Sequence, residues 1–265
     1  MSERKAILVT GSSHGIGAAT VIAFAKDGYD VGINYNKTPE GAQSVAEECR
    51  RYGVDAQIYQ CDVGRRDQCE RMLNAFINHF GRIDVLVNNA GGALKMPKGG
   101  FVDMPMDYWD EQIALNLNSA AYCSQLAARC MIEKGIHGSI INISSIHSLV
   151  TWVKRKALPY SAGKAGMNMF TKSIGVELIK HGINVNCIAP GLVYTKIMDR
   201  YSERDIRGFE RKIPAGRGGT VDDIVPMIQF LADKKKSSFI VGQTIFIDGG
   251  QSIDGVIDCM LEDEI

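Results

Sequence analysis

The chain has 265 residues, of which 45% are hydrophobic and 23% are charged, a composition typical of a folded globular protein and not of a disordered or fibrous segment. Thirty basic and thirty acidic side chains cancel, so no overall field attracts a nucleic acid or an anionic membrane. No apolar run approaches the length of a membrane span or a signal-peptide core, and no cysteine or histidine cluster has zinc-ligand spacing. We therefore expect a single cytoplasmic domain over residues 1–265, with no metal.

Short β-branched runs alternate with longer amphipathic segments, which is the pattern of βαβ units that form a parallel sheet. Strands are expected at 6–10, 30–35, 56–60, 83–88, 139–144, 184–188 and 244–247, and helices at 15–27, 39–52, 66–80, 107–134, 158–181 and 220–232. The predicted fold class is α/β, a single-domain Rossmann fold whose doubly wound, seven-stranded parallel sheet has helices on both faces. Ligands of such sheets bind at the carboxyl ends of the strands.

A glycine-rich turn follows the first strand and opens the first helix. Its sequence is Thr10-Gly-Ser-Ser-His-Gly-Ile-Gly17, where the glycines allow a tight turn and the helix N-terminus offers free N–H groups to a pyrophosphate. A plain glycine turn is the simpler interpretation, but the position between strand and helix favours a dinucleotide site.

The same turn also matches the G-x-S-x-G elbow of serine hydrolases through Gly11-Ser-Ser-His-Gly15. That elbow is expected after several strands, with its acid and histidine following later in the chain. Here it lies in the first βα turn, so the hydrolase is the weaker hypothesis.

Three further motifs follow the predicted strands: Asn88-Asn-Ala-Gly91, Tyr160-Ser-Ala-Gly-Lys164 and Pro190-Gly191. Together with the glycine-rich turn they make the chain resemble the short-chain dehydrogenase/reductase family over nearly its whole length. The resemblance implies an oxidoreductase that uses a nicotinamide dinucleotide to interconvert a secondary alcohol and a ketone or aldehyde. It also implies a homotetramer built through the helices at 107–134 and 158–181 and the last strand with its C-terminal tail.

The resemblance implies that the dinucleotide contacts residues after six of the strands. Asp62 would contact the adenine, although it could equally cap the following helix, and the backbone near Val193 with the Thr195 hydroxyl would hold the carboxamide. The expected cofactor-binding residues are Gly11, Ser13, His14, Gly15, Ile16, Gly17, Asn36, Lys37, Asp62, Val63, Asn89, Ala90, Gly91, Tyr160, Lys164, Pro190, Gly191, Val193 and Thr195.

The segment after the second strand bears on the choice of cofactor. Asn34-Tyr-Asn-Lys37 contains no carboxylate to bind a ribose 2′-hydroxyl, whereas His14 and Lys37 could contact a 2′-phosphate. Either residue alone is more often a solvated surface side chain. The missing carboxylate favours NADP(H), with NAD(H) possible.

Tyr160 and Lys164 are four residues apart on a predicted helix, which places their side chains on one face. A free tyrosine has a pKa of about 10, and an ammonium about 4 Å away contributes about 4 kcal/mol at an effective dielectric constant of about 20. We therefore expect Lys164 to lower the pKa of Tyr160 toward the range of general acid–base catalysis. A lone pair with this spacing would more simply be a surface pair, but the surrounding motifs favour catalysis.

The resemblance adds two residues to this pair. It assigns Ser145 to orient the substrate oxygen, with Ser144 and Ser148 left open, and Asn116 to a water that relays protons to Lys164, with Asn118 as its rival. The expected catalytic residues are thus Asn116, Ser145, Tyr160 and Lys164.

Segments 92–110, 146–159 and 192–215 are expected to recognise the substrate, because they follow strand ends beside the catalytic pair. An apolar wall could form there from Met96, Phe101, Met104, Trp152 and Tyr194, although these could simply pack a lid or a subunit contact. Sequence similarity near Ser145 favours the sugar and polyol dehydrogenases of the family, including those that oxidise glucose.

Three alternatives remain. A 3-oxoacyl-[acyl-carrier-protein] reductase would use Lys154-Arg-Lys156 to bind an anionic carrier, although such a triplet is more often a solvated loop. A hydroxysteroid dehydrogenase is a related possibility. A non-catalytic dinucleotide-sensing protein is a different class, and the retention of Asn116, Ser145, Tyr160 and Lys164 argues against it.

Overall fold

Seven parallel strands form one sheet in the computed structural model, which describes residues 4–94, 100–151, 158–196, 198 and 201–253. The strand order is β3-β2-β1-β4-β5-β6-β7, so successive crossovers run in opposite directions from β1 and leave a crevice at the carboxyl ends of β1 and β4. The strands are β1 Ala6–Val9, β2 Asp30–Tyr35, β3 Ala56–Gln60, β4 Val85–Asn88, β5 Ser139–Ile143, β6 Asn184–Pro190 and β7 Thr244–Ile247.

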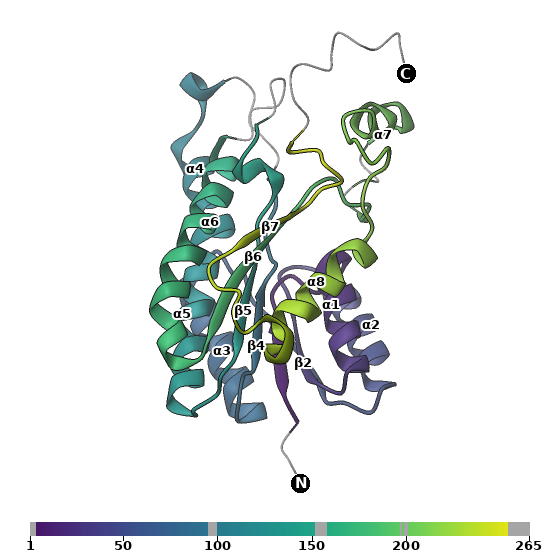
Figure 1. Ribbon diagram of the computed structural model, residues 1–265. Coiled ribbons are helices and arrows are strands. Elements are labelled where there is room, and N and C mark those ends of the chain that lie inside the picture. Colours follow the sequence, from purple (N-terminus) through teal and green to yellow (C-terminus); the bar gives the residue numbers. More distant parts are fainter. Residues whose placement is uncertain (1–3, 95–99, 152–157, 197, 199–200, 254–265) are drawn as a thin grey trace.

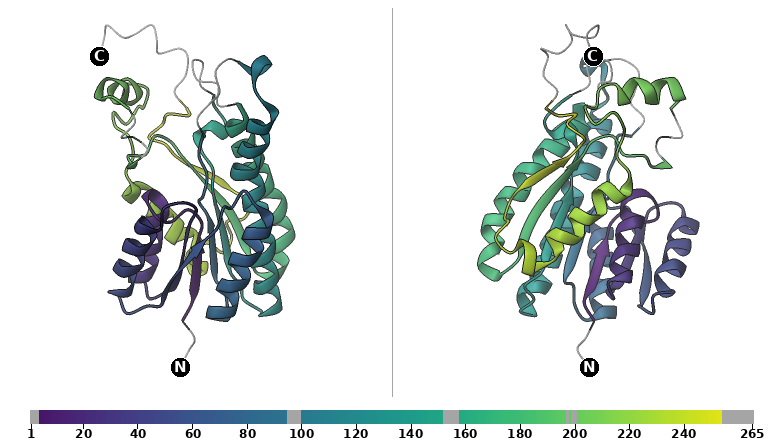
Figure 2. Two further views of the ribbon diagram at one scale, coloured as in Figure 1. Left: turned by 180° about the vertical axis from the view of Figure 1, so that it is seen from behind. Right: turned by 45° about the vertical axis from the view of Figure 1, so that its right-hand side comes forward.

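Helices cover both faces of the sheet (Figures 1 and 2). One face carries α1, α2 and α8, and the other carries α3, α5 and α6, while α4 and α7 lie near the carboxyl ends of the strands. The helices are α1 Gly15–Lys26, α2 Pro39–Arg50, α3 Arg66–Phe80, α4 Met106–Ile113, α5 Ser119–Glu133, α6 Leu158–Leu178, α7 Glu203–Glu210, α8 Val221–Ala232 and α9 Lys234–Ser237.

Alternate residues of the central strands point into two separate apolar layers, as a pleated strand requires. Val9 and Ile141 pack in the layer under α1, α2 and α8. Leu8 and Ile140, their neighbours in sequence, pack in the layer under α3 and α5. Because both faces are buried, these strands are mostly apolar, and the polar residues inside them, such as Asn34, Asn142 and Asn186, are buried as well.

The predicted α/β fold is confirmed, and the seven expected strands all form, with ends shifted by at most two residues. The segment 107–134, expected as one helix, is broken into α4, a π-helical turn at Ala114–Asn118, and α5. Helix α7 was not expected because its sequence is mostly charged, but Ser202 and Asp205 form a capping box that starts it. Among the described helices, all are too short or too polar to cross a bilayer.

Candidate active site

The glycine-rich turn between β1 and α1 is shaped by close backbone contacts. Gly11 and Gly15 have φ angles of 62° and 60°, a region that favours glycine. A methyl group on Gly11 would lie 2.8 Å from Ala90 Cα, and one on Gly17 would lie 2.6 Å from the Gly11 carbonyl oxygen. The turn therefore needs glycine at these positions in order to pack against the segment after β4.

The N-terminus of α1 points into this turn. His14 is its N-cap residue but makes no side-chain capping bond, so the first N–H groups of the helix, from Gly15 to Gly17, remain available to an anion. Ser13 and His14 bond each other through Oγ and Nδ1 at 3.0 Å. These groups fit the pyrophosphate of a dinucleotide.

Asn34 holds the turn in place, and the sequence analysis did not assign it a role. Its Oδ1 accepts a hydrogen bond from the Gly11 N–H at 2.9 Å, and its Nδ2 lies 3.2 Å from the carbonyl oxygens of Tyr35, Tyr59 and Cys61. The residue is only 2% exposed. A buried asparagine inside an apolar strand was the signal that could have identified it, because such a group needs specific partners.

Asn89 fixes the first strand relative to the fourth. Its Nδ2 donates to the carbonyl oxygens of Thr10 and Gly11 at 2.9 and 3.0 Å, while the Thr10 hydroxyl accepts from the N–H groups of Asn89 and Ala90, both at 3.0 Å. The expected Asn89–Gly91 segment thus lies directly beside the glycine-rich turn.

The residues expected around the adenosine half of the cofactor lie at the ends of β2 and β3. Asn36, Lys37 and His14 are exposed. Asp62 accepts from the Gly64 N–H at 3.0 Å in a local turn, whereas the N-cap residue of α3 is Arg65, so Asp62 does not cap that helix. The Val63 side chain is buried in the core, which leaves its backbone as the part that can face a ligand.

The segment after β6 brings further expected residues to the turn. A β-bridge joins Val193 to Gly219, and its bonds use the Leu192 carbonyl and the Tyr194 N–H. The N–H and C=O of Val193 therefore face the opposite side. A methyl group on Gly15 would lie 3.4 Å from Thr195 Cγ2, so this segment closes over the glycine-rich turn.

Pro190 and Gly191 set the path of that segment. Pro190 is the last residue of β6, and the Gly191 N–H donates to the Ile247 carbonyl at 3.0 Å. A methyl group on Gly191 would lie 2.8 Å from Asp248 Cα. Glycine is therefore needed where the chain leaves β6 beside the end of β7.

Tyr160, Lys164 and Ser145 meet where β5 ends against α6. Lys164 is 3% exposed, its Nζ donates to the Ile143 carbonyl at 2.8 Å, and it lies 5.9 Å from the centroid of the Tyr160 ring. The Ser145 side chain lies within hydrogen-bonding reach of the Tyr160 phenol. The four-residue spacing thus places both side chains on one helix face, as expected.

The pKa of Tyr160 shifts in the opposite direction from our expectation. Burial raises it, and the hydrogen bond with Ser145 only partly offsets that rise. Burial also lowers the pKa of Lys164 to about 8. The expectation of an acidified phenol was wrong because it counted the attraction of the ammonium and neglected the removal of both groups from water.

Asn116 joins this group through the π-helical turn, a feature often found at functional sites. Its Oδ1 accepts from the Gly92 N–H at 2.9 Å, and its Nδ2 donates to the Gly92 carbonyl at 3.1 Å. A methyl group on Gly91 would lie 2.9 Å from Asn116 Oδ1 and 3.0 Å from Lys164 Nζ. Asn116 is fully buried, whereas its rival Asn118 is partly exposed.

The neighbouring serines have structural partners. The Ser144 hydroxyl donates to the Lys164 carbonyl at 3.1 Å, and the Ser148 hydroxyl donates to the Ser145 carbonyl at 2.7 Å. His147, which was not singled out from the sequence, is buried with its ring centroid 6.0 Å from that of Tyr160. Among these serines, Ser145 is the one whose hydroxyl approaches the phenol.

The expected apolar wall is only partly brought together. The Tyr194 hydroxyl donates to a Glu210 carboxylate oxygen and accepts from the Gly218 N–H, which links the segment after β6 to α7. Phe101 is largely exposed. Met96, Trp152 and the basic triplet 154–156 lie outside the described residues.

Comparison with known proteins places this arrangement among oxidoreductases. A family model described as enoyl-(acyl carrier protein) reductase matches residues 11–252. The chain is 36% identical over 250 residues to the 3-oxoacyl-[acyl-carrier-protein] reductase FabG of Staphylococcus aureus, covering 94% of this chain and 99% of that protein. It is 33% identical to 3beta-hydroxysteroid dehydrogenase 1 of Eggerthella lenta, with 94% of each chain covered.

The fold is also similar to that of a solved structure. The structure of acetoin dehydrogenase YohF from Salmonella typhimurium superposes with a TM-score of 0.85 at 34% sequence identity. The match covers 96% of this chain and 99% of that one. The likeness therefore extends over the whole sheet and its helices.

Proposed function

This chain belongs to the short-chain dehydrogenase/reductase family and is an oxidoreductase that acts on CH–OH groups; from that premise we propose that it interconverts a small secondary alcohol and its ketone with NADP(H). The observation that carries the proposal is the meeting of Tyr160, Ser145 and Lys164 at the end of β5, beside the glycine-rich turn. When bound, the nicotinamide supplies or accepts the hydride.

The raised pKa of the half-buried phenol suits the reducing direction. Because burial raises the pKa of Tyr160, the hydroxyl keeps its proton at neutral pH and can donate it to a carbonyl oxygen. Ser145 is placed to bond the same oxygen and orient it. As the proton leaves, the phenolate gains the attraction of the Lys164 ammonium, which is held by the Ile143 carbonyl.

The residues near the end of β2 favour NADP(H). The Asn34 side chain turns inward to the Gly11 N–H, so it leaves no group on the outer side for a ribose 2′-hydroxyl. Lys37 and His14 are exposed at this corner and carry the hydrogen-bond donors that a 2′-phosphate needs.

For the substrate, we propose a small hydroxy compound such as a hydroxyketone, polyol or sugar. The whole-chain likeness to a protein titled acetoin dehydrogenase supports a small hydroxyketone. The similarity to FabG supports a second candidate, a 3-oxoacyl thioester, and the hydroxysteroid dehydrogenase supports a third.

An absorbance assay at the reduced-nicotinamide band tests these proposals. Purified protein is offered NADPH and NADH with acetoin, diacetyl, sugars, a steroid ketone and an acetoacetyl thioester. We expect NADPH-dependent reduction of the small ketones at the highest kcat/KM. Faster turnover of the thioester would replace the proposed substrate class, and binding of NADPH without oxidation by any carbonyl would favour a sensing protein.

We also propose a homotetramer assembled through α5, α6 and β7. Met169 and Val176 on α6 are 62% and 75% exposed, which is unusual for apolar side chains on a helix unless another subunit covers them. Light scattering coupled to gel filtration measures the mass directly, and a monomer of 29.0 kDa would contradict this part of the proposal.

A further inference from the structure

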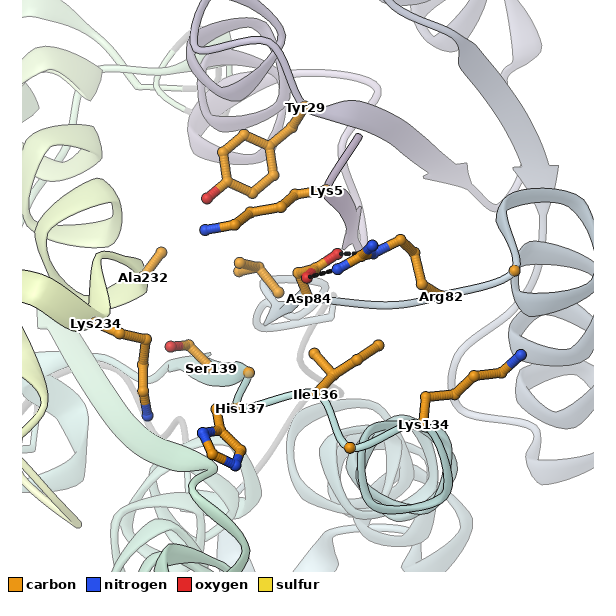
Figure 3. A pocket seen from close by; sticks show the side chains of 14 residues that line it. Lys5, Tyr29, Arg82, Asp84, Lys134, Ile136, His137, Ser139, Ala232 and Lys234 are labelled. Atoms are coloured by element: carbon orange, nitrogen blue, oxygen red, sulfur yellow. Dashed lines mark hydrogen bonds and ion pairs between the residues drawn. The ribbon is translucent and has the colours of Figure 1, made fainter. Parts of the chain in front are cut away.

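A cavity lies at the edge of the sheet opposite the catalytic groups, where the strands begin. Its volume is about 570 Å³, and it is formed by residues that precede β1, β4 and β5 together with the α8–α9 connection. A five-residue strand such as β5 is about 17 Å long, so this cavity is separate from the catalytic groups at the carboxyl edge. Figure 3 shows the side chains that line it.

Three lysines from separate parts of the chain line the cavity and give it an excess of positive charge. Lys5 precedes β1, Lys134 follows α5 and Lys234 begins α9, and all three line the cavity. The guanidinium of Arg82 is engaged by Asp84 through two hydrogen bonds of 2.8 Å, so that pair contributes little net charge. Among the described residues, neither Lys5 nor Lys134 forms a salt bridge with a carboxylate.

The Ser139 hydroxyl is an independent sign that this cavity binds a polar ligand. Ser139 is 1% exposed, and its Oγ has no hydrogen-bond partner within the described part of the chain. A buried hydroxyl left without a partner is unfavourable, so such groups are rare in native proteins. Ser139 lines this cavity between the lysines (Figure 3), where an acceptor oxygen of a ligand would satisfy it.

Two further side chains limit what the ligand can be. The Lys5 Nζ lies 5.8 Å above the centroid of the Tyr29 ring, which holds the ammonium at the rim beside an aromatic face. Lys234 donates to the Gly182 carbonyl at 2.7 Å and to Asn184, so its ammonium is fixed at the opposite wall. The charges therefore surround a space much larger than one inorganic ion.

We propose that this cavity binds a small organic anion, bearing a phosphate or carboxylate group, at a site distinct from the catalytic one. Its oxyanion accepts a hydrogen bond from the Ser139 hydroxyl, and the ammonium groups of Lys5 and Lys134, which line separate parts of the cavity, attract it electrostatically. The volume lies within the range of small-molecule sites, and the uncharged part of the ligand packs on Tyr29.

The test measures anion binding to the full-length protein by calorimetry and by thermal shift, with citrate, glycerol 3-phosphate and inorganic phosphate as probes. We expect saturable binding of at least one organic probe that is tighter than that of inorganic phosphate, and a higher melting temperature with it. Ser139→Ala and the double variant Lys5→Gln/Lys134→Gln should each weaken binding about tenfold, the loss of one charge-assisted hydrogen bond or more.

Two controls make the result specific. Lys26→Gln/Lys172→Gln removes two lysines elsewhere on the surface, as the test variant does at the cavity, and should leave binding unchanged. Lys37→Gln removes one lysine at the predicted dinucleotide site and should also leave binding of the probe unchanged. Ser139→Ala removes an unbonded hydroxyl, so its melting temperature without probe should not fall. Equal affinity in Ser139→Ala and the parent, equal weakening by the control pair, or no saturable binding of any probe would each overturn the proposal.

Discussion

The site at the carboxyl edge of the sheet has two halves, the nucleotide half beside β1 and β2 and the catalytic half beside β5. The two halves differ in how their polar groups are bonded. Beside β1 and β2, the side chains of Asn34 and Asn89 hydrogen-bond to backbone groups. These bonds hold the glycine-rich turn without any ionised side chain. Beside β5, the site buries Lys164 with a bond to one carbonyl and places a phenol next to it. The first half is held rigidly, and the second carries an electrostatic cost that fits the chemistry we propose for these groups.

The largest expected effect is in the catalytic half. Tyr160→Phe removes the proposed proton donor while keeping the ring, and should lower kcat for ketone reduction by about 10²–10⁴-fold. Because the variant keeps the ring and removes one hydroxyl that bonds the Ser145 side chain, the melting temperature should change little. Ser161→Ala, the next residue on α6, is the matched control. Unchanged reduction by Tyr160→Phe would remove the assigned chemistry.

The charge cost at Lys164 should appear as a pH dependence of stability. Its pKa is about 8 in the folded protein and about 10.5 ordinarily, so the penalty is fully present below pH 8 and is relieved as pH rises toward 10.5. Relative to Lys164→Met, the parent should gain of the order of 3 kcal/mol in unfolding free energy across this window. Denaturant titrations at several pH values measure it.

Lys26→Met serves as the control for that titration, because Lys26 is exposed. Its substitution removes one ammonium group that is not buried. A difference between parent and Lys164→Met that is flat from pH 7 to pH 10.5 would show that the ammonium is not strained in the folded state. The catalytic half would then resemble the nucleotide half in its electrostatics.

In the nucleotide half, Asn34→Ala should destabilise the fold. It leaves the Gly11 N–H without its partner and removes a donor from the carbonyls of Tyr35, Tyr59 and Cys61, for a loss of about 1–3 kcal/mol in unfolding free energy. Dinucleotide affinity should fall as well, since the turn loses its support. Asn36→Ala, exposed two residues later, should have almost no effect on stability. Equal stability of the two variants would contradict the rigidity assigned to this half.

The smallest effect concerns cofactor choice. Lys37→Gln should weaken NADPH binding by about tenfold, the equivalent of one charge-assisted hydrogen bond, and leave NADH binding unchanged. Fluorescence titration of each reduced cofactor measures the two affinities, with Lys26→Gln as the control. An equal loss for both cofactors would place Lys37 away from the 2′-phosphate.

The strands and most helices could be predicted because their burial repeats at fixed sequence intervals. Gly11 and Gly17 could be located because glycine is required where backbones approach closely. The position of Asn34 inside an apolar strand could have indicated a buried polar contact, but its partners could not be predicted, because they lie on neighbouring strands and in the glycine-rich turn. The pKa of Tyr160 was mispredicted for a related reason: a four-residue spacing specifies proximity to Lys164 but says nothing about exclusion of water.

The π-helical turn at Ala114–Asn118 has a consequence for how this chain can vary. Each α-helical residue advances about 100° around the axis, and a wider turn inserts one extra residue into that count. It lets Asn116 face Gly92 while Cys123 and Ala127 of α5 still face the sheet. Side chains of this turn can be substituted without changing that geometry. A one-residue deletion, however, would break either the contact of Asn116 with Gly92 or the packing of Cys123 and Ala127 against the sheet.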